Sequence, residues 1–259
     1  MRPEHDQAYV KRRFSRAAAG YDRLAFVQDD VMRDLFRKLP DLTGKDVLDV
    51  GCGTGRLLKE ILSLGPRSLV GVDMAPGMVA QAKRALPASV RVLEADAVAL
   101  PLEDATFDLV VSASSLQWCS DLAMALGEVR RVLRPGGGFR AALFSEKTLQ
   151  EFFESLKAGG GGRLVSVLSR LPSIREVRRA LEEADFPDAA VFSEERLVVF
   201  RDLWSLLIWL KSLGANSLGR GAFLGRGVLK AAEEYYATRY AVEGGLRVTF
   251  EVIWIEGRK

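Results

Sequence analysis

Three carboxylates and a glycine-rich turn in the first half of the chain are the residues best suited to bind a charged ligand. The segment 47–55 is an apolar run that contains Asp49 and continues with alternating glycines at Gly51, Gly53 and Gly55. Glycine permits sharp turns and lets a ligand approach the backbone closely. A dinucleotide-binding turn has its third glycine three residues after the second, whereas here the spacing is two. The turn alone leaves the identity of the ligand open.

Two further carboxylates stand where the next apolar runs end. Asp73 ends SLVGVD, and a carboxylate at that place accepts hydrogen bonds from both hydroxyls of a ribose. Asp96 ends VLEAD, and an acceptor there, followed by the small Ala97, suits the amino group of an adenine. The order of these groups therefore predicts a site for an adenosine-containing ligand.

The composition excludes several classes of function. The chain has 259 residues, of which 48% are hydrophobic, so it can build a sizeable core. Its formal charge of +3 is too small to indicate a nucleic-acid partner. Two cysteines cannot form a disulfide framework, and a single histidine argues against a histidine-based metal site or catalytic triad. We expect no metal and a cytoplasmic location.

The most apolar late stretch, LWSLLIWLKSLGA, is interrupted by Lys211, and the N-terminus lacks the continuous apolar core of a signal peptide. We therefore expect no membrane association.

The elements that must position the carboxylates follow from alternating apolar runs and helical stretches, which are typical of βαβ units. The expected strands are 46–50, 68–73, 90–94, 107–112, 138–144, 189–200 and 246–255. The expected helices are 56–64, 76–85, 121–133, 146–157, 172–184, 202–213 and 226–240, and residues 1–39 are also expected to be helical. This pattern predicts an α/β fold with a doubly wound, seven-stranded, mostly parallel sheet and a helical cap. The glycine run 159–162 is expected to be a mobile loop.

Several segments together resemble the class I S-adenosylmethionine-dependent methyltransferases: LDVGCGTG, VGVDMAPGMVAQAK, EADAVALPLEDATFDLVVS and EVRRVLRPGG, all within about residues 40–145. The resemblance implies a Rossmann-like fold and S-adenosyl-L-methionine as cofactor, released as S-adenosyl-L-homocysteine. It assigns the methionine end to Asp49 and the glycine loop, the ribose to Asp73 and the adenine to Asp96. The full expected cofactor-binding set is Asp49, Gly51, Cys52, Gly53, Thr54, Gly55, Asp73, Met74, Met78, Asp96, Ala97 and Ser114.

The outer segments resemble a narrower family, the malonyl-[acyl-carrier protein] O-methyltransferases of the biotin pathway. KRRFSRAAAGYDRLAFVQ, SSLQWCSDLAMALGEVRRVLRPGG, LWSLLIWLKSLGANS and the closing LRVTFEVIWIEGRK carry this resemblance over nearly the whole chain. It implies methyl transfer to the free carboxylate of a malonyl group on acyl carrier protein, giving the methyl ester that primes pimeloyl synthesis. We expect one domain over residues 1–259, with a cap segment at 1–39, a cofactor-binding core at 40–145 and cap insertions at 146–171 and 202–244.

A carboxylate acceptor is already ionised at pH 7, so no general base and no catalytic side chain are expected. Expected substrate-binding residues are Tyr21, Gln117, Trp118, Arg140 and Lys211, with Lys211 or Arg140 as the cation that faces the carboxylate. Each has a structural alternative: a lysine stem lying along a helix, an arginine in an ion pair, or an aromatic ring packed in the core.

Acyl carrier protein is acidic, so the basic residues Lys11, Arg12, Arg13 and Arg16 are expected to form its docking face, unless they are only a solvated helix face. Two rival functions remain at this stage. One is methylation of a small molecule or quinone, and the other is a non-catalytic adenosylmethionine-binding assembly factor.

Overall fold

A twisted mixed sheet runs through the molecule. Crossover connections join its parallel strands, and one long strand, β8, runs antiparallel to its neighbours. The computed structural model describes residues 7–161, 171–213 and 225–259. The sheet order is β3-β2-β1-β4-β5-β8-β6, and the short β7 pairs with β8 beside this path. The strands are β1 (Asp46–Val50), β2 (Ser68–Asp73), β3 (Arg91–Glu94), β4 (Phe107–Ala113), β5 (Leu133–Phe144), β6 (Ala190–Phe200), β7 (Ala241–Val242) and β8 (Gly245–Arg258). Strands β1 to β5 pair in parallel, and β8 runs antiparallel to both β5 and β6.

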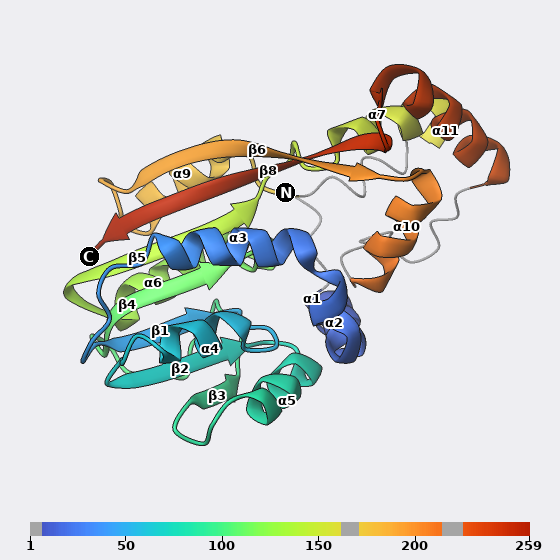
Figure 1. The fold of residues 1–259 in the computed structure, drawn as a ribbon. Coiled ribbons are helices and arrows are strands. Elements are labelled where there is room, and N and C mark those ends of the chain that lie inside the picture. Colours follow the sequence, from blue (N-terminus) through green and yellow to red (C-terminus); the bar gives the residue numbers. More distant parts are fainter. Residues whose placement is uncertain (1–6, 162–170, 214–224) are drawn as a thin grey trace.

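Helices cover both faces of this sheet, as the alternating pattern predicts (Figure 1). The α-helices are α1 (Gln7–Ala17), α2 (Tyr21–Leu24), α3 (Phe26–Arg37), α4 (Arg56–Leu62), α5 (Pro76–Ala85), α6 (Leu122–Val132), α7 (Gln150–Leu156), α9 (Ile174–Glu183), α10 (Leu203–Ser212) and α11 (Arg226–Tyr240). Three short turns of other helix types are η1 (Ala18–Gly20), η2 (Leu116–Trp118) and η3 (Lys157–Gly161). The predicted doubly wound α/β architecture is confirmed, with the two-residue β7 added to the seven expected strands.

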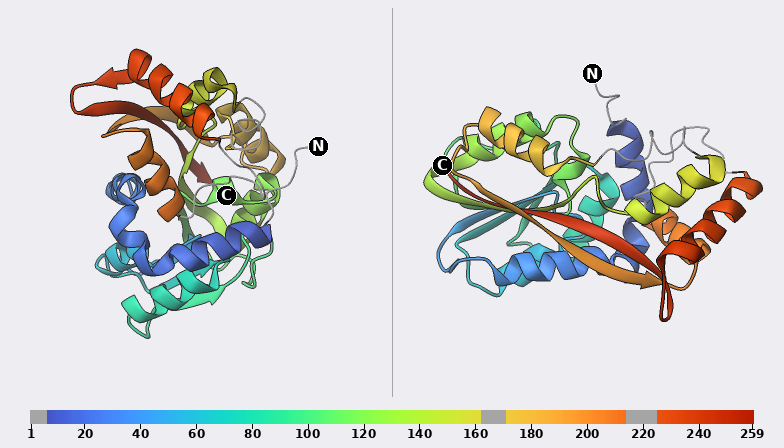
Figure 2. Two further views of the ribbon diagram at one scale, coloured as in Figure 1. Left: turned by 90° about the vertical axis from the view of Figure 1, so that its right-hand side faces the viewer. Right: turned by 90° about the horizontal axis from the view of Figure 1, so that it is seen from above.

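Two buried apolar clusters, one on each side of the sheet, form the core. On one side α6 and α9 pack against strand residues such as Leu48 and Val110. On the other side α3, α4 and α10 pack against the adjacent strand residues, such as Val47 and Val111, whose side chains point to the opposite face of the sheet. The right-hand view of Figure 2 shows the sheet between these helical layers. Because successive strand side chains point to opposite faces, a continuous apolar strand is buried on both.

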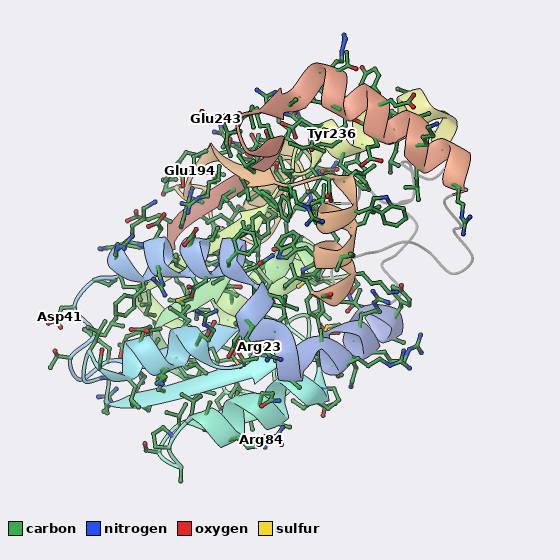
Figure 3. The ribbon with its side chains drawn as sticks, turned by 45° about the vertical axis from the view of Figure 1, so that its right-hand side comes forward. Arg23, Asp41, Arg84, Glu194, Tyr236 and Glu243 are labelled. Atoms are coloured by element: carbon green, nitrogen blue, oxygen red, sulfur yellow. The ribbon has the colours of Figure 1, made fainter. Side chains whose placement is uncertain are left out.

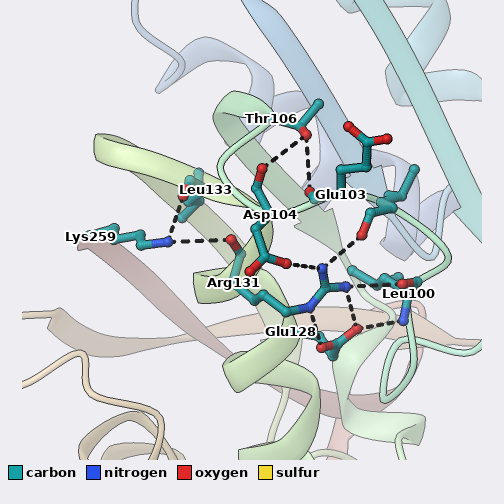
Figure 4. Close-up of polar contacts among 9 residues, drawn as sticks. Leu100, Glu103, Asp104, Thr106, Glu128, Arg131, Leu133 and Lys259 are labelled. Carbon is teal, nitrogen blue, oxygen red and sulfur yellow. Dashed lines mark hydrogen bonds and ion pairs between the residues drawn. The ribbon is translucent and has the colours of Figure 1, made fainter.

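An arginine network ties together the edge of the sheet where the parallel strands begin. The guanidinium of Arg131, near the end of α6, donates to the carboxylates of Glu128 and Asp104 and to the carbonyl oxygens of Leu100 and Leu102 (Figure 4). These contacts hold the loop before β4 against α6. They lie at the opposite edge from the carboxyl ends of β1, β2 and β4, which the predicted site uses.

The chain differs from the sequence-based expectation at two glycine-rich places. Strand β5 begins at Leu133 rather than at residue 138, because Leu133 pairs with Phe107 of β4. The backbone of Lys259 also accepts a hydrogen bond from the Gly136 N–H and donates one to the Gly137 carbonyl oxygen. The expectation of a mobile loop at 159–162 is wrong for Gly159–Gly161. These residues continue α7 as η3 and pack on α11, where a Cβ on Gly159 would lie 2.6 Å from the carbonyl oxygen of Val228. Residue 162 lies outside the described residues.

Candidate cofactor and acceptor site

The glycine loop turns the chain from β1 into α4 and leaves open space beside its backbone. Gly51, Gly53 and Gly55 have φ values of 76°, 54° and 87°, a region in which glycine is strongly favoured. A Cβ on Gly51 would lie 1.7 Å from the Oγ of Ser115, whereas a Cβ on Gly53 would meet no atom within 4 Å. Gly53 therefore lets a ligand lie directly against the backbone.

Asp73 at the end of β2 braces this loop. Its Oδ2 accepts a hydrogen bond from the Gly53 N–H at 2.9 Å, and its Oδ1 accepts one from the Ala75 N–H at 2.8 Å. Burial raises the pKa of Asp73 to about 6, and these two hydrogen bonds act in the opposite direction. The carboxylate is therefore held in a fixed orientation, with lone pairs left for a ligand's hydroxyl groups.

Asp49 on β1 is a buried carboxylate with an unsatisfied oxygen. The residue is only 1% exposed, and its Oδ1 has no hydrogen-bond partner. Burial raises its pKa to about 8, and the neighbouring Asp73 adds to the increase. An unpaired carboxylate in such surroundings is stabilised by a cation. The site therefore favours a ligand that carries positive charge at this point.

A single cavity collects nearly all of the expected cofactor-binding residues. The members that line it are Asp49, Gly51, Cys52, Gly53, Thr54, Asp73, Met74, Met78, Asp96, Ala97 and Ser114. Gly55 does not line it. A Cβ on Gly55 would lie 2.8 Å from Leu86 Cδ1, so this glycine serves the turn into α4 and its close packing on α5.

A second cavity, with no charged residue among its described lining, lies next to the first, and five residues line both: Phe14, Tyr21, Gln28, Ser114 and Trp118. We call these shared residues the throat. The rest of the second cavity is lined by Gln117, Phe144, Thr148, Leu149, Leu171, Trp209, Leu210, Leu213 and Phe250. The two cavities together can place a cofactor and an acceptor group on either side of the throat.

The N-terminal helices are held over the throat by contacts from several elements. The Thr54 hydroxyl donates to Asp22 at 2.6 Å, and Arg56 of α4 forms an ion pair with Asp29 of α3. The Nε1 of Trp209 on α10 donates to the carbonyl oxygen of Leu24 at 2.7 Å. Figure 1 shows α1, α2 and α10 together beyond one edge of the sheet. The cap over the site is thus fastened both to the glycine loop and to α10.

Only parts of the expected cap insertions line the two cavities among the described residues. Among the described residues of 146–171, Thr148, Leu149 and Leu171 line a cavity, and among those of 202–244 the lining residues belong to α10 and its end. Helices α7 and α11 pack side by side at the far end of the β6–β8 ribbon and contribute no residue to these two cavities among the described positions (Figure 2).

Two of the five expected substrate-binding residues are not at the site. Arg140 lies on β5 with its guanidinium paired to Glu256 of β8 and hydrogen-bonded to the carbonyl of Phe139, so it lines neither cavity. Lys211 is exposed on α10 and also lines neither cavity, although its neighbours Trp209 and Leu210 do. Neither residue therefore places a cation at these two cavities, and the cation expected to face the carboxylate is not found among their described lining residues. Tyr21, Gln117 and Trp118 do line the cavities.

The N-terminal basic residues divide into two kinds. Lys11 pairs with Glu94 at 2.6 Å, and Arg13 lies over the ring of Tyr9. Arg12 and Arg16 are exposed on α1.

Sequence reasoning missed Gln28, Arg56 and several aromatic walls of the second cavity. A single glutamine on an amphipathic helix does not indicate a binding site, because glutamine is equally common on a helix face that is exposed to solvent. Phe14 and Trp209 stand within segments that carried the family resemblance, so that resemblance was the available clue.

The residues present fit adenosylmethionine on three structural grounds. The orphaned oxygen of buried Asp49 suits a positively charged amino group, the space beside Gly53 admits a ligand against the backbone, and Asp73 presents a fixed carboxylate. Asp96 holds its own turn by accepting from the Val98 N–H at 3.2 Å. No helix among the described residues is long and apolar enough to cross a bilayer, and they contain no cluster of side chains suited to hold a metal ion.

Comparison with known proteins agrees with this geometry. A family described as a methyltransferase domain matches residues 48–141. The fold is similar to that of the YcgJ protein of Bacillus subtilis, with a TM-score of 0.64 and 20% identity, over 89% of this chain and 98% of that one. Malonyl-[acyl-carrier protein] O-methyltransferase of Geobacter sulfurreducens is 36% identical, over 98% of this chain and 99% of that protein. The biotin biosynthesis bifunctional protein BioHC of Saccharophagus degradans is 29% identical, over 96% of this chain and 46% of that protein.

Fold, glycine loop and family match together define an S-adenosylmethionine-dependent methyltransferase. Within that class, 36% identity over nearly the full length of the Geobacter sulfurreducens protein places the chain in the malonyl-[acyl-carrier protein] O-methyltransferase family.

Proposed function

We propose that this chain methylates the free carboxylate of a malonyl group carried on acyl carrier protein, forming the methyl ester that primes pimeloyl synthesis for biotin. The proposal is carried by the throat, which joins the cofactor cavity to an apolar, aromatic-walled acceptor cavity. The family of the chain supports the same substrate, and a biotin-synthesis protein is among its relatives. Esterification masks the charge, so that chain-extending enzymes can treat the product as an ordinary acyl group.

In this proposal Asp49 and the loop Gly51–Thr54 bind the methionine end of the cofactor. Asp73 binds the ribose, while Asp96 and Ala97 bind the adenine beside Met74 and Met78. When bound, adenosylmethionine would supply an electrophilic methyl group on a sulfonium, which would pass in line to the acceptor oxygen while the sulfur leaves as the neutral thioether of adenosylhomocysteine. The fixed carboxylate of Asp73 and the open backbone at Gly53 orient the bound ligand before the acceptor arrives.

The side chains of the throat align the acceptor and exclude water. A malonyl carboxylate has a reference pKa of about 4 and is ionised at neutral pH, so it needs no base. Burial, with added repulsion from Asp73 and Asp22, raises the pKa of Tyr21 above its usual value. The Tyr21 O–H therefore stays protonated and acts as a hydrogen-bond donor. Catalysis then depends on alignment and desolvation.

We further propose that the acidic carrier docks on the exposed cations of α1. Arg12 and Arg16, the docking pair, are exposed on the helix whose Val10 and Phe14 line the cofactor cavity. A carrier bound there would have its malonyl arm close to the cavity mouth. Rim charges of this kind act mainly on association rate and on salt dependence.

The test compares acceptors that differ only in the terminal carboxylate or in the carrier. Purified protein with adenosylmethionine is incubated with malonyl-carrier protein, acetyl-carrier protein and free malonate, and adenosylhomocysteine release is measured. We expect release with malonyl-carrier protein, none with acetyl-carrier protein and much less with free malonate. Equal release with the acetyl and malonyl carriers would contradict carboxylate methylation, and preference for free malonate would contradict a carrier substrate.

A further inference from the structure

The part of the acceptor side that the structure describes offers no cation with which to bind a carboxylate. Among the described residues, the lining of the second cavity contains no Lys, Arg or His. The cofactor cavity has one cationic lining residue, Arg56, and its guanidinium is paired with Asp29. Among the described residues, a carboxylate that enters the throat therefore meets only neutral hydrogen-bond donors to replace its lost hydration.

Two polar side chains of the throat have buried atoms that lack a partner. The Oγ of Ser114 is buried and unsatisfied, and so is the Oε1 of Gln28. A buried polar atom without a partner is costly in free energy, and such atoms cluster where a ligand completes the bonding. Both residues line both cavities, so a group bound by them lies on the boundary between cofactor and acceptor.

The backbone of Ser114 is held in an unfavourable conformation that presents this hydroxyl. Its φ of 54° lies in the left-handed region, which a serine seldom adopts. The Ser114 N–H donates to the Ala142 carbonyl at 2.7 Å, and the Ser114 carbonyl accepts from the Gln117 side chain at 2.9 Å. Such strain persists where the surroundings enforce it, and it concentrates at functional sites.

Gln28 reaches the throat from α3, a helix fixed in the core by Val27 and Val31. Its amide carries an N–H₂ donor and a carbonyl acceptor of nearly the same shape, so a half-turn exchanges the two in the same space. The buried end can therefore donate to an anion. Together with the protonated Tyr21 hydroxyl, the throat offers three neutral donors.

We propose that Gln28 and Ser114 bind the acceptor carboxylate through neutral hydrogen bonds, so that the site selects an ionised carboxylate without forming a salt bridge to it. This inference rests on the proposed function and names the residues that recognise its substrate. Neutral donors orient the carboxylate and replace its lost water, while leaving more electron density on the attacking oxygen than an ion pair would.

The test measures acceptor binding and turnover separately in three variants. Gln28→Met keeps the length of the side chain without its polar atoms, Ser114→Ala keeps the Cβ at the strained position, and Gln81→Met on α5 is a matched control that lines neither cavity. Binding of malonyl-carrier protein is measured in the presence of adenosylhomocysteine, and kcat/KM is measured with adenosylmethionine. We expect Gln28→Met to lose about 10- to 100-fold in both, the range of a hydrogen bond to a charged group, and Ser114→Ala to lose a similar or smaller factor.

The Gln28→Glu variant adds a pH dependence of kcat/KM that would not be seen if Gln28 only supported the fold. A carboxylic acid at this place donates when protonated and repels the acceptor when ionised. Its kcat/KM should therefore fall steeply relative to the unsubstituted protein as the pH rises from about 5 to 8. Adenosylmethionine affinity should stay within about threefold in both Gln28 variants and in Gln81→Met.

Unchanged acceptor binding in Gln28→Met would overturn this inference alone, and so would an equal loss of cofactor affinity. If the unsubstituted protein neither binds nor methylates malonyl-carrier protein, both the inference and the proposed function are wrong.

Discussion

Ionisation of Asp49 should control cofactor affinity, and the substitution Asp49→Asn isolates its charge. The carboxylate is 1% exposed, and burial, with repulsion from Asp73, raises its pKa to about 8. In the unliganded protein most Asp49 side chains are therefore protonated at pH 6, whereas about half are ionised at pH 8. A cationic ligand binds the ionised form, so binding must first remove the proton below this pKa.

The size of the effect follows from the ionised fractions. With a pKa of about 8, the ionised fraction of Asp49 rises from about 1% at pH 6 to about 50% at pH 8, while the cofactor's α-amino group, with a reference pKa of about 7.7–8.0, loses about half of its protons. The product of the two fractions strengthens the cofactor's affinity by about 20-fold. The affinity should stop rising at about pH 8, because above it the loss of the cofactor's amino proton outweighs the further ionisation of Asp49. Asp73, with its pKa raised by burial to about 6, contributes only to the lower part of this range.

Calorimetric titration with adenosylmethionine between pH 6 and pH 8.5, in buffers of different ionisation enthalpy, measures both affinity and proton release. The unsubstituted protein should release close to one proton at pH 7. The Asp49→Asn variant should bind adenosylmethionine weakly and release fewer protons on binding. Its affinity should also depend less on pH above pH 7. The matched control is Asp41→Asn, because Asp41 is exposed on the loop before β1, at the left edge of Figure 3 and far from α2 with its labelled Arg23.

An affinity that is constant between pH 6 and pH 8 would refute the assignment of Asp49 to the cationic end of the cofactor. The same conclusion would follow if the Asp49→Asn variant kept the pH dependence of the unsubstituted protein. The variant should fold, because an amide and a protonated carboxyl group have nearly the same size and are both neutral.

Three further outcomes are expected. Asp73→Asn should weaken adenosylmethionine binding by about 1.5–3 kcal/mol in a calorimetric titration, and an unchanged affinity would remove Asp73 from the site. Reversing both charges of the docking pair to Glu should raise the KM for malonyl-carrier protein, and this increase should be smaller at high salt. The KM for a small malonyl thioester without the carrier should not change. Reversal at the exposed Arg84 of α5, labelled in Figure 3, is its matched control, and an equal loss on both substrates would contradict docking. Because a hydrogen bond from Arg67 lowers the pKa of Asp46, this pair should stabilise the fold above about pH 4 and lose that effect as the pH falls further. Urea unfolding should show a shallower acid dependence in Asp46→Asn.

The central sheet was predictable because its local signals agree with the global fold. Strands β1 and β2 and helices α5 and α11 have the bounds expected from the sequence. Continuous apolar runs mark strands that are buried on both faces, and Pro76 at the start of α5 marks a helix N-terminus. The same signals put the carboxylates Asp49, Asp73 and Asp96 on one edge of the sheet.

The acceptor side was less predictable because it depends on contacts between distant segments. Arg140 looked unusual on a buried strand, but its partner Glu256 is 116 residues away and only the β5–β8 pairing brings the two together. The glycines 159–161 have the composition of a loop, and only the approach of α11 shows that Gly159 is required for close helix packing. Gln28 acquires meaning from its position between the cavities rather than from its type.

The most direct test of this account is mass spectrometry of malonyl-carrier protein after incubation with the enzyme and adenosylmethionine, with fragmentation of the prosthetic arm. We expect one added methyl group, located on the terminal carboxylate and removed by mild alkaline ester hydrolysis. A malonyl-carrier protein that remains unmodified, or a methyl group located on the polypeptide or on the methylene carbon, would contradict it.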